Sequence, residues 1–430
     1  MNLTVKQTNK ISGEVIVPGD KSISHRAVML GALAEGTTTI DGFLMGADCL
    51  STINCFRALG IPISVDGNKV VVIGGGKTGF CTPDTVLDTG NSGTTTRLIM
   101  GILASEPGLY AVLNGDSSLN GRPMGRVTKP LTEMGAEIYG RAGGTMMPVT
   151  IRGHHLKAIE YQSPVASAQV KSALLLAGLR AQGKCRYTEP SLSRDHTENM
   201  LEAFGADLTR SGTTVELEGG QVLTGQRVQV PGDISSAAFL IVAALIVPQG
   251  HLLVKNVGIN VTRSGIIEAL LEMGADIQIL NRRFFGREEV ADLEVKSSSL
   301  RAAQFGGSHI PRMIDEIPAL AVAALTAKGK TIIKDAQELR VKESDRISAL
   351  AVELKKFGAV ITERPDGIEI IGGRLLQGSC VSSHQDHRLA MSLAMAGLIA
   401  QGTTKIEGAE SVTVSFPDFT EVLKSISEAS

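Results

Sequence analysis

The most regular feature of the chain is an apolar helical segment followed by a glycine and a strand-like run, which recurs six times in 430 residues. An Ala- and Leu-rich run precedes each glycine, and residues that favour strands, mostly β-branched, follow it. The glycines are 67 to 79 residues apart, close to one sixth of the chain, and such a period indicates internal repeats. They are Gly36, Gly108, Gly183, Gly250, Gly329 and Gly402.

A second helical segment follows in each repeat, and in five repeats it ends at a glycine before another strand. Glycine suits the position just past a helix, where a left-handed φ is needed. These glycines are Gly60, Gly135, Gly205, Gly274 and Gly358. The sixth second helix is predicted over residues 416–426 and closes the chain.

Each repeat therefore predicts helix, strand, helix, strand, strand, which together make an α/β fold. The first helices are apolar nearly all round, as in residues 237–247, so we expect them in the interior. Helices inside and sheets outside reverse the arrangement of a doubly wound sheet, which carries its helices on the outer faces. A solenoid of stacked repeats is the alternative interpretation.

The sequence Val-Pro-Gly-Asp occurs at residues 17–20 and again at residues 230–233, each time just before a first helix. Two matching Pro-Gly bends are what a chain would use to pass from one lobe to another and back. We predict a discontinuous lobe of residues 1–19 plus 230–430 and a continuous lobe of residues 20–229, each with three repeats. Clefts between lobes are favoured ligand sites, so we expect the active site there.

The composition of the chain argues against several classes of protein. A net charge of −2, no Trp, 4 Tyr and 11 Phe argue against a nucleic-acid or membrane-surface protein. The five cysteines form no C-x-x-C pair, so we expect reduced, mostly buried thiols and no metal site made from them. The longest apolar run, residues 237–247, is about half of the ~20 residues that cross a bilayer. The N-terminus lacks a signal peptide's apolar core, and we expect a soluble, cytoplasmic protein.

Residues 17–26 (VPGDKSISHR) lead from a predicted strand into a predicted helix. Lys21, Ser22 and Arg26 lie at its start, where free N–H groups and the helix dipole favour a phosphate or carboxylate. A capped helix with two solvated cations is the simpler interpretation of this stretch alone.

Similar polar or cationic clusters open other helices. Residues 88–97 combine two glycines with Arg97 but lack the G-K-[ST] ending of a P-loop. Residues 167–172 offer hydroxyl, amide and ammonium groups, including those of Ser167, Gln169 and Lys171, suited to a polyhydroxylated anionic substrate. Residues 383–388 open the sixth first helix.

Residues 340–346 (RVKESDR) are placed at the start of a second helix. Lys342 and Arg346 are spaced i, i+4, which puts them on one helix face. Glu343 and Asp345 beside them leave open a solvated charge lattice as the alternative.

Two further residues point to an anionic substrate. Arg122 lies in a turn-rich loop that would not bury a cation without an anionic partner. Asp315 precedes a very apolar helix, where it is either an N-cap or a general base within a basic site. Six or more cations at helix starts imply a small polyanion carrying phosphate and carboxylate. No Ser-His-Asp arrangement, metal-ligand spacing or dinucleotide motif stands out.

These motifs together resemble the enolpyruvyl transferase family, in the branch that acts on shikimate-3-phosphate. The resemblance runs over nearly all of the chain and rests on residues 18–26, 90–97, 120–124, 315–316, 340–346 and 386–388. It implies two lobes of three βαβαββ units each, an inside-out α/β barrel. It also implies transfer of the enolpyruvyl group of phosphoenolpyruvate to the 5-hydroxyl of shikimate-3-phosphate through a tetrahedral intermediate, in aromatic amino acid biosynthesis. The implied enzyme needs no metal or organic cofactor and acts as a monomer.

The resemblance also implies roles for the matching positions. Asp315 is the base at the hydroxyl, and Glu343 and Lys21 are the candidates for proton transfer at C3. Shikimate-3-phosphate would be bound by Lys21, Ser22, Arg26, Ser167, Gln169, Asp315 and Lys342, with Arg194 from a bacterial subgroup pattern. Phosphoenolpyruvate would be bound by Lys21, Gly93, Arg122, Gln169, Arg346 and Arg388. Supporting positions are Asn91, Thr94 and His387.

The chain departs from the family pattern at two positions. Val414 stands where part of the family has a lysine, and Ala168 stands where many members have a second serine. The sister enzyme that acts on UDP-N-acetylglucosamine would carry a catalytic cysteine in the first half, but no cysteine lies between Cys81 and Cys185. A phosphometabolite-binding or scaffold protein is the non-enzymatic alternative. The family is the target of the herbicide glyphosate, which occupies the phosphoenolpyruvate site, and Gly93 of that site is retained.

Overall fold

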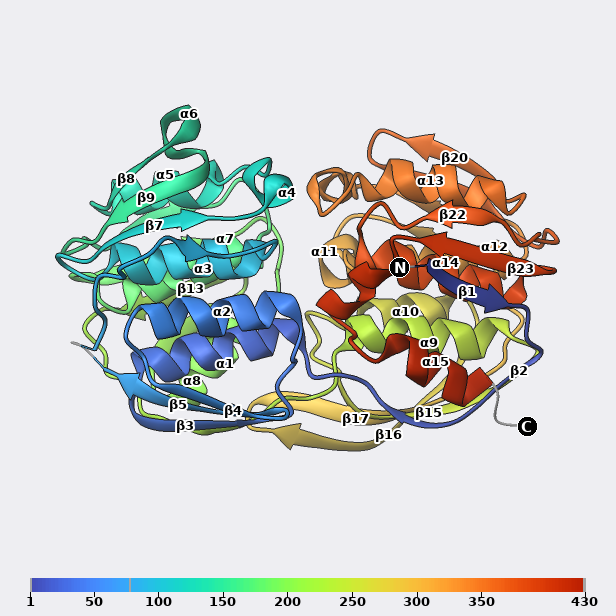
Figure 1. Ribbon diagram of the computed structural model, residues 1–430, viewed down its shortest axis with the longest axis horizontal. Coiled ribbons are helices and arrows are strands. Elements are labelled where there is room, and N and C mark those ends of the chain that lie inside the picture. Colours follow the sequence, from blue (N-terminus) through green and yellow to red (C-terminus); the bar gives the residue numbers. More distant parts are fainter. Residues whose placement is uncertain (1, 77–78, 428–430) are drawn as a thin grey trace. The chain divides into compact units, whose positions relative to one another are not determined.

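The structure, a computed structural model, describes residues 2–76 and 79–427 (Figure 1). Its contacts divide the chain into two compact units. Unit 1 comprises the chain up to Pro18, Pro231–Phe284 and the chain from Glu289 on, and unit 2 comprises Gly19–Val230 with Phe285–Glu288. Two compact units of this kind differ from the single stacked array of a solenoid.

Unit 2 holds three successive sets of helices and strands. The first is α1 (Lys21–Leu33), β3 (Glu35–Asp41), α2 (Ala47–Ala58), β4 (Ile63–Asp66) and β5 (Lys69–Gly75). The second is β6 (Leu87–Asp88), α3 (Gly93–Ala104), β7 (Tyr110–Asn114), α4 (Ser117–Asn120), α5 (Gly125–Glu133), β8 (Glu137–Gly140), α6 (Arg141–Gly144) and β9 (Met146–Arg152). The third is β10 (Glu160–Gln162), α7 (Ala168–Gly178), β11 (Lys184–Thr188), α8 (His196–Ala203), β12 (Leu208–Ser211) and β13 (Thr214–Glu218), followed by β14 (Arg227–Gln229).

Unit 1 begins with β1 (Asn2–Lys6) and β2 (Lys10–Ile16) and resumes after unit 2. Its fourth set is α9 (Ile234–Ile246), β15 (Gln249–Gly258), α10 (Gly265–Glu272), β16 (Asp276–Phe285) and β17 (Glu288–Lys296). The fifth is β18 (Gln304–Phe305), α11 (His309–Met313), α12 (Ile317–Thr326), β19 (Lys330–Ile333), the 3-10 helix η1 (Gln337–Val341), α13 (Arg346–Lys356), β20 (Val360–Arg364) and β21 (Gly367–Ile371). The sixth is β22 (Cys380–Ser382), α14 (His387–Ile399), β23 (Thr403–Glu407), the 3-10 helix η2 (Ala409–Val414) and α15 (Phe419–Ser427).

The described strands form one sheet per set, five of four strands and one of three. In the second, third, fifth and sixth sets, the strand before the first helix lies parallel to the strand after it; in the first and fourth sets this parallel place is taken by β14 and β2 instead. The remaining strands extend each sheet antiparallel. The sheet β10-β11-β13-β12 shows this pattern, and β6-β7-β9-β8 and β18-β19-β21-β20 repeat it. The sixth sheet is completed by β1, which pairs with β23. The mixed α/β fold predicted from the sequence is therefore confirmed.

At each of the two Pro-Gly bends, the preceding strand belongs to one unit and the following helix to the other. Strand β2 pairs with β15 of unit 1, and the chain then passes through Pro18 into α1 of unit 2. Strand β14 pairs with β3 of unit 2, and the chain then passes through Pro231 into α9 of unit 1. Gly19 is needed at the first bend because a Cβ there would lie 2.0 Å from the Gly42 carbonyl oxygen.

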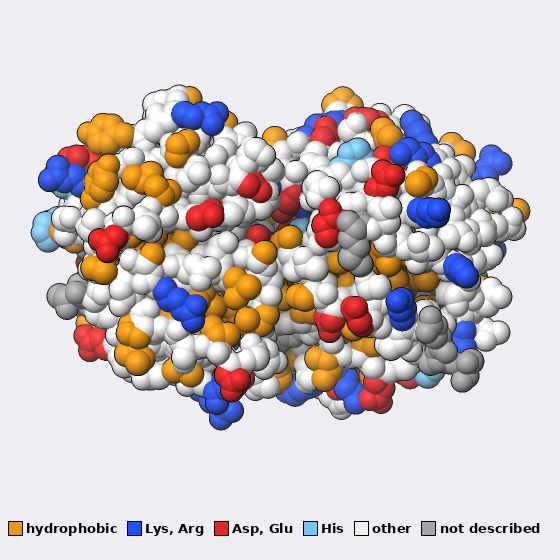
Figure 2. All heavy atoms as spheres, viewed as in Figure 1, with side chains coloured by type: hydrophobic (Ala, Val, Ile, Leu, Met, Phe, Trp, Pro, Cys, Tyr) orange, Lys and Arg blue, Asp and Glu red, His pale blue; other side chains and the backbone are white. Residues whose placement is uncertain are grey.

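The first helices supply much of the core of each unit. Helix α9 is buried along its whole length, and α12 and α14 are buried along nearly all of theirs. None of the described helices combines the length and apolarity needed to cross a bilayer. Of the five cysteines, Cys49, Cys55 and Cys185 are buried and two are exposed. On the face drawn in Figure 2, basic and acidic side chains are interspersed.

Two predicted helix starts are wrong. The last helix begins at Phe419 rather than at residue 416, because a residue before a proline, here Pro417, disfavours helical φ/ψ. Helix α13 begins at Arg346 rather than at residue 340, because Asp345 caps it by accepting a hydrogen bond from the Ser348 N–H at 3.0 Å. Lys342 lies before that cap, so Lys342 and Arg346 do not share a helix face.

Candidate active site

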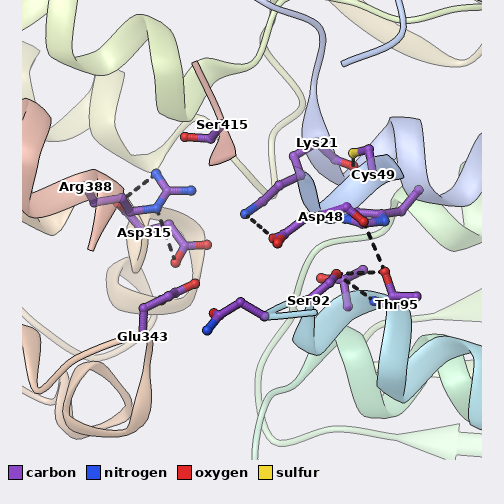
Figure 3. Close-up of polar contacts among 12 residues, drawn as sticks. Lys21, Asp48, Cys49, Ser92, Thr95, Asp315, Glu343, Arg388 and Ser415 are labelled. Carbon is purple, nitrogen blue, oxygen red and sulfur yellow. Dashed lines mark hydrogen bonds and ion pairs between the residues drawn. The ribbon is translucent and has the colours of Figure 1, made fainter. Parts of the chain in front are cut away.

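In unit 2, helix α1 opens with a lysine whose ammonium contacts a carboxylate. Asp20 caps the helix by accepting from the Ile23 N–H at 2.9 Å, which places Lys21 at the first helical position. The Lys21 Nζ lies 3.1 Å from Oδ2 of Asp48, in the first turn of α2 (Figure 3). Both side chains are mostly shielded from water. The positive charge of Lys21 is thus held at a helix N-terminus, where the helix dipole adds to it.

Arg26 lies one turn further along α1 and is 3% exposed. Its Nε donates to Oγ1 of Thr197 at 2.6 Å, and its Nη2 donates to Oγ of Ser172 at 2.8 Å. A third bond, from Nη1, goes to the Ser22 carbonyl at 2.9 Å. These three acceptors are neutral, so they orient the guanidinium without cancelling its charge.

The imidazole of His25 lies next to these charges, and they affect its pKa. Its Nδ1 lies 2.6 Å from Oγ1 of Thr52. Burial lowers the pKa of His25 well below 6.5, and the charges of Lys21 and Arg26 lower it further. The start of α1 is therefore a region of positive potential.

Residues 88–97 and residues 167–172 contact each other through the side chain of Gln169. Gln169 accepts from Nη1 of Arg97 at 2.9 Å and donates to Oγ1 of Thr94 at 3.0 Å. Ser92 caps α3 by accepting from the Thr95 N–H at 3.1 Å (Figure 3). The starts of α3 and α7 thus lie side by side within unit 2.

Gly93 and Ser167 occupy the helix starts themselves. Gly93 is the first residue of α3, and a Cβ on it would lie 2.6 Å from Nη1 of Arg97, so the backbone and this guanidinium are closely packed. Ser167 caps α7 by accepting from the Val170 N–H at 3.4 Å.

Arg122 is a buried cation whose contacts are all neutral. It is 9% exposed, and its Nη2 donates to Oδ1 of Asn91 at 2.5 Å and to Oγ of Ser118 at 3.1 Å. A longer bond goes from Nη1 to the Asn91 carbonyl at 3.4 Å, and Nε has no hydrogen-bond partner. Among the residues that the structure describes, no carboxylate pairs with it. A buried, uncompensated charge is costly, so this position suits an anionic ligand.

In unit 1, Asp315 is surrounded by cations. Its Oδ1 lies 3.4 Å from Nζ of Lys342, 3.2 Å from Nη1 of Arg346 and 3.9 Å from Nε of Arg388. The Arg388 Nη1 also donates to the Asp315 carbonyl at 3.1 Å (Figure 3). Asp315 is not an N-cap, because Glu316 takes that position on α12.

Arg346 is 1% exposed and contacts three carboxylates. Its Nη2 bonds Glu343 at 2.7 Å, and its Nε bonds Asp386 at 2.8 Å, in addition to the contact with Asp315. Burial disfavours the charge, but the carboxylates of Asp386, Glu343 and Asp315 outweigh it and raise the pKa of Arg346. The guanidinium is therefore permanently charged and fixed in orientation.

A tight turn delivers Asp386 and Arg388 to this cluster. His384 and Gln385 both adopt left-handed backbone conformations, with φ of 51° and 58°. Such φ values are costly for residues other than glycine and are often found at functional sites. The turn leaves Asp386 as the cap of α14, with His387 and Arg388 in the first turn of that helix.

Known proteins resemble the chain over its whole length. The family model for EPSP synthase (3-phosphoshikimate 1-carboxyvinyltransferase) matches residues 5–423.

The chain belongs to the EPSP synthase family.

Relatives of this family include a 3-phosphoshikimate 1-carboxyvinyltransferase from Brevibacillus brevis, 56% identical and covering 99% of this chain and 100% of that protein. One from Bacillus thuringiensis subsp. konkukian is also 56% identical, covering 98% of each. The solved EPSP synthase from Acinetobacter baumannii is 45% identical, with a TM-score of 0.89 over 99% of this chain and 98% of that one. The enolpyruvyl transferase NikO from Streptomyces tendae shares the fold at 19% identity, with a TM-score of 0.80 over 99% and 97%.

The predicted EPSP synthase site residues fall into two groups. Those of unit 2 are Lys21, Ser22, Arg26, Asn91, Gly93, Thr94, Arg122, Ser167, Gln169 and Arg194. Those of unit 1 are Asp315, Lys342, Glu343, Arg346, His387 and Arg388. Within unit 2, hydrogen bonds join Gln169 to Thr94 and Arg122 to Asn91, and within unit 1 ion pairs join Asp315 to Lys342, Arg346 and Arg388. Arg194 lies in the loop before α8.

Sequence reasoning overlooked three groups in or beside these clusters and misjudged one. Asp48 was missed because an acidic residue in the first turn of a helix is ordinary. Asp386 and Thr197 were missed because neither stands out without knowledge of its partner. Lys171, expected to face a substrate, instead contacts Glu189 and Glu198 in the interior.

Proposed function

We propose that this chain transfers the enolpyruvyl group of phosphoenolpyruvate to the 5-hydroxyl of shikimate-3-phosphate and releases phosphate. The observation that carries the proposal is the match to the EPSP synthase family over residues 5–423, with relatives 56% identical along their whole length. The chemistry of the two clusters agrees, because both substrates are anions and the clusters are rich in buried cations.

The proposal includes the finer architecture. Each unit consists of three repeats that enclose their first helices behind sheets, an inside-out α/β barrel, and residues of both units act on the same two substrates. The burial of α9 along its whole length and the shared strand order of the sheets support this arrangement.

The cations of unit 2 divide by substrate. Arg122, with Lys21, Gly93 and Gln169, binds phosphoenolpyruvate, since a buried cation with only neutral partners gains most from an anion. Ser22, Arg26, Ser167, Gln169 and Arg194, again with Lys21, bind shikimate-3-phosphate. Asn91 supports the site by orienting the guanidinium of Arg122, and Thr94 by bonding the amide of Gln169.

In unit 1, Arg346 and Arg388 bind phosphoenolpyruvate, and Lys342 binds shikimate-3-phosphate. The carboxylates around Arg346 set its position in the absence of substrate. Glu343 is the most exposed of the three that contact it, at 23% of its side chain, so it is the one that a bound anion can displace. His387, next to Arg388 in the first turn of α14, supports this cluster.

Asp315 is the general base. It accepts the proton of the 5-hydroxyl as that oxygen forms a bond to C2 of phosphoenolpyruvate, while C3 takes a proton from Lys21 or Glu343. In the second half of the reaction, the tetrahedral intermediate loses a proton from C3 and its C2–O bond to phosphate breaks, so the vinyl group is restored. General acid–base steps of this kind contribute roughly 10²–10⁴-fold each. Contacts with Lys342, Arg346 and Arg388 hold the Asp315 carboxylate in place.

The test is to mix the protein with both substrates and measure inorganic phosphate. Phosphate release that requires both substrates is expected, and absence of release overturns the proposal. An Asp315→Ala variant should still bind phosphoenolpyruvate in a calorimetric titration but turn over at least about 100-fold more slowly. Unchanged turnover would remove Asp315 from the role of base.

A further inference from the structure

A buried cluster of charges lies in unit 2 behind the start of helix α7. Lys171 is 1% exposed, and its Nζ lies 2.9 Å from Oε1 of Glu189 and 2.8 Å from Oε1 of Glu198. Burial disfavours the ammonium, but Glu198 and Glu189 outweigh this and raise the pKa of Lys171. Burial also raises the pKa of Glu198, despite the attraction of Lys171. The cluster is thus a fixed set of one ammonium and two glutamates in the interior.

Stability alone is a poor explanation for such a cluster. Replacing buried ion pairs with well-packed apolar side chains is often neutral or stabilising, because desolvation offsets the attraction between the charges. What buried charges with fixed hydrogen bonds do well is to specify the position of the segments that carry them. The segment held here is the loop of residues 189–195, which contains Arg194.

Glu189 makes more contacts to this loop than to Lys171. Its Oε1 accepts from the Ser193 N–H at 2.9 Å, and its Oε2 accepts from the Ser193 hydroxyl at 2.6 Å. The Lys171 Nζ also bonds the Ser193 carbonyl at 3.4 Å. Backbone and side chain of Ser193 are therefore fixed, and Ser193 directly precedes Arg194.

The other side of Arg194 is fixed as well. Asp195 pairs with Arg210 at 3.3 Å. His196 is 2% exposed, and its Nδ1 lies 2.9 Å from Oε1 of Glu288, a residue of the short segment Phe285–Glu288 that belongs to unit 2. Arg194 thus stands between two anchored stretches of backbone.

We propose that Glu189, held in place by Lys171, is a positioning residue that fixes Arg194 for the phosphate of shikimate-3-phosphate. This inference rests on the proposed function, because it takes shikimate-3-phosphate as the ligand. Glu189 touches no substrate and acts only through Ser193 and the backbone of Arg194. The same Lys171 lies two residues from Gln169 on α7, so one ammonium links two segments of the binding site.

Glu198 provides a matched control. It contacts the same ammonium at nearly the same distance and is equally buried, but it lies on helix α8, outside the loop of residues 189–195. Glu189→Gln and Glu198→Gln each leave Lys171 with one carboxylate. Only Glu189→Gln changes the contacts to Ser193, because an amide offers one oxygen where the carboxylate offers two, and its NH2 group would face the Ser193 hydroxyl that now donates to Oε2.

The experiment measures the Kd of shikimate-3-phosphate by calorimetry in the absence of phosphoenolpyruvate. Glu189→Gln should weaken binding at least tenfold, whereas Glu198→Gln should stay within twofold of the wild type. Arg194→Ala should weaken binding by a similar factor, and the double variant Glu189→Gln/Arg194→Ala should bind no more weakly than Arg194→Ala alone. The KM of phosphoenolpyruvate should stay unchanged in Glu189→Gln.

Equal weakening by Glu189→Gln and Glu198→Gln, or effects that multiply in the double variant, would overturn the proposal. Should Glu189→Gln fail to fold, Ser193→Ala removes only the 2.6 Å bond to Glu189 and should weaken binding about threefold. Ser193→Ala with wild-type affinity would then overturn it.

Turnover separates this inference from the proposed function. A wild-type protein that binds shikimate-3-phosphate but releases no phosphate with phosphoenolpyruvate contradicts the proposed reaction, and the affinity series still decides the role of Glu189. A wild-type protein that turns over normally while Glu189→Gln keeps its affinity contradicts only the positioning role. A wild-type protein that does not bind shikimate-3-phosphate overturns both.

Discussion

Helices α1 and α9 follow the same Val-Pro-Gly-Asp sequence but differ in every position that could carry a charge. Lys21, the first residue of α1, corresponds to Ile234 of α9, and Arg26 corresponds to Phe239. Both helices are capped by the aspartate, Asp20 in one and Asp233 in the other. The bend and the cap are therefore structural requirements shared by both helices, whereas the cations are not needed to build either one.

The polar groups at the start of α9 form hydrogen bonds and ion pairs with other buried groups. Ser235 donates to Glu316 and accepts from Nη2 of Arg263 at 2.7 Å, and Arg263 lies 3.2 Å from Asp233. All four residues are at most 3% exposed. At α1, Lys21 is partly exposed and meets one carboxylate, whereas Arg26 is as buried as the α9 groups but donates to the neutral hydroxyls of Thr197 and Ser172. The difference teaches that the same bend and cap can precede a helix start that we propose to bind substrate, in unit 2, and one whose charges form a buried network, in unit 1.

The sharpest way to break this comparison is to make the same substitution in both helices. Lys21→Met should lower kcat about 10²–10⁴-fold, since it removes both a proposed substrate contact and a candidate proton donor. Ile234→Met conserves volume and polarity and should cost less than about 1.5 kcal/mol of stability with little change in turnover. Steady-state kinetics and urea denaturation of both variants test this, and similar turnover in the two would contradict the assignment of Lys21.

The second prediction concerns the cohesive role of the α9 start. Arg263→Met removes a cation from two buried carboxylates, Asp233 and Glu316, and should lower the free energy of unfolding by roughly 3–5 kcal/mol. Arg263→Lys, which keeps the charge, should lose less. Urea denaturation monitored by circular dichroism measures both. A loss below about 1 kcal/mol in Arg263→Met would show that this network does not hold unit 1 together.

Much of the fold could be predicted from the sequence because the repeats are regular. Segments that are apolar all round, such as α9, have only one stable environment, the interior. Helix boundaries were harder. The i, i+4 spacing of Lys342 and Arg346 does not reveal that Asp345 caps the helix between them, and capping depends on which conformation the chain adopts there.

The charged residues of the candidate site could be predicted where they belong to a recognisable motif. The residues that pair with them could not. Nothing in the sequence shows that Lys171 meets Glu189 and Glu198, or that Lys21 meets Asp48, because these pairs form between segments 18 to 27 residues apart. A buried cation and a substrate-binding cation have the same residue type. Only the packing around each one distinguishes them.

The smallest predicted effect is a pH dependence that exists at α1 and has no counterpart at α9, where Ala238 corresponds to His25. Burial and the charges of Lys21 and Arg26 hold the pKa of His25 below 6.5 in the folded state. Below pH 6.5 the unfolded chain therefore binds a proton that the folded chain does not, and stability falls as the pH falls.

Between pH 7.5 and pH 5.5 this one group should therefore lower the stability of the wild type. His25→Gln, which can still bond Thr52, should lose correspondingly less stability between pH 7.5 and 5.5, whereas the exposed His155→Gln should behave like the wild type. Lys21→Met should reduce the acid sensitivity partway, because Lys21 is one of the charges that lower the pKa of His25. Identical acid sensitivity in all four proteins would mean that the start of α1 carries no positive field, and the contrast with α9 would lose its electrostatic basis.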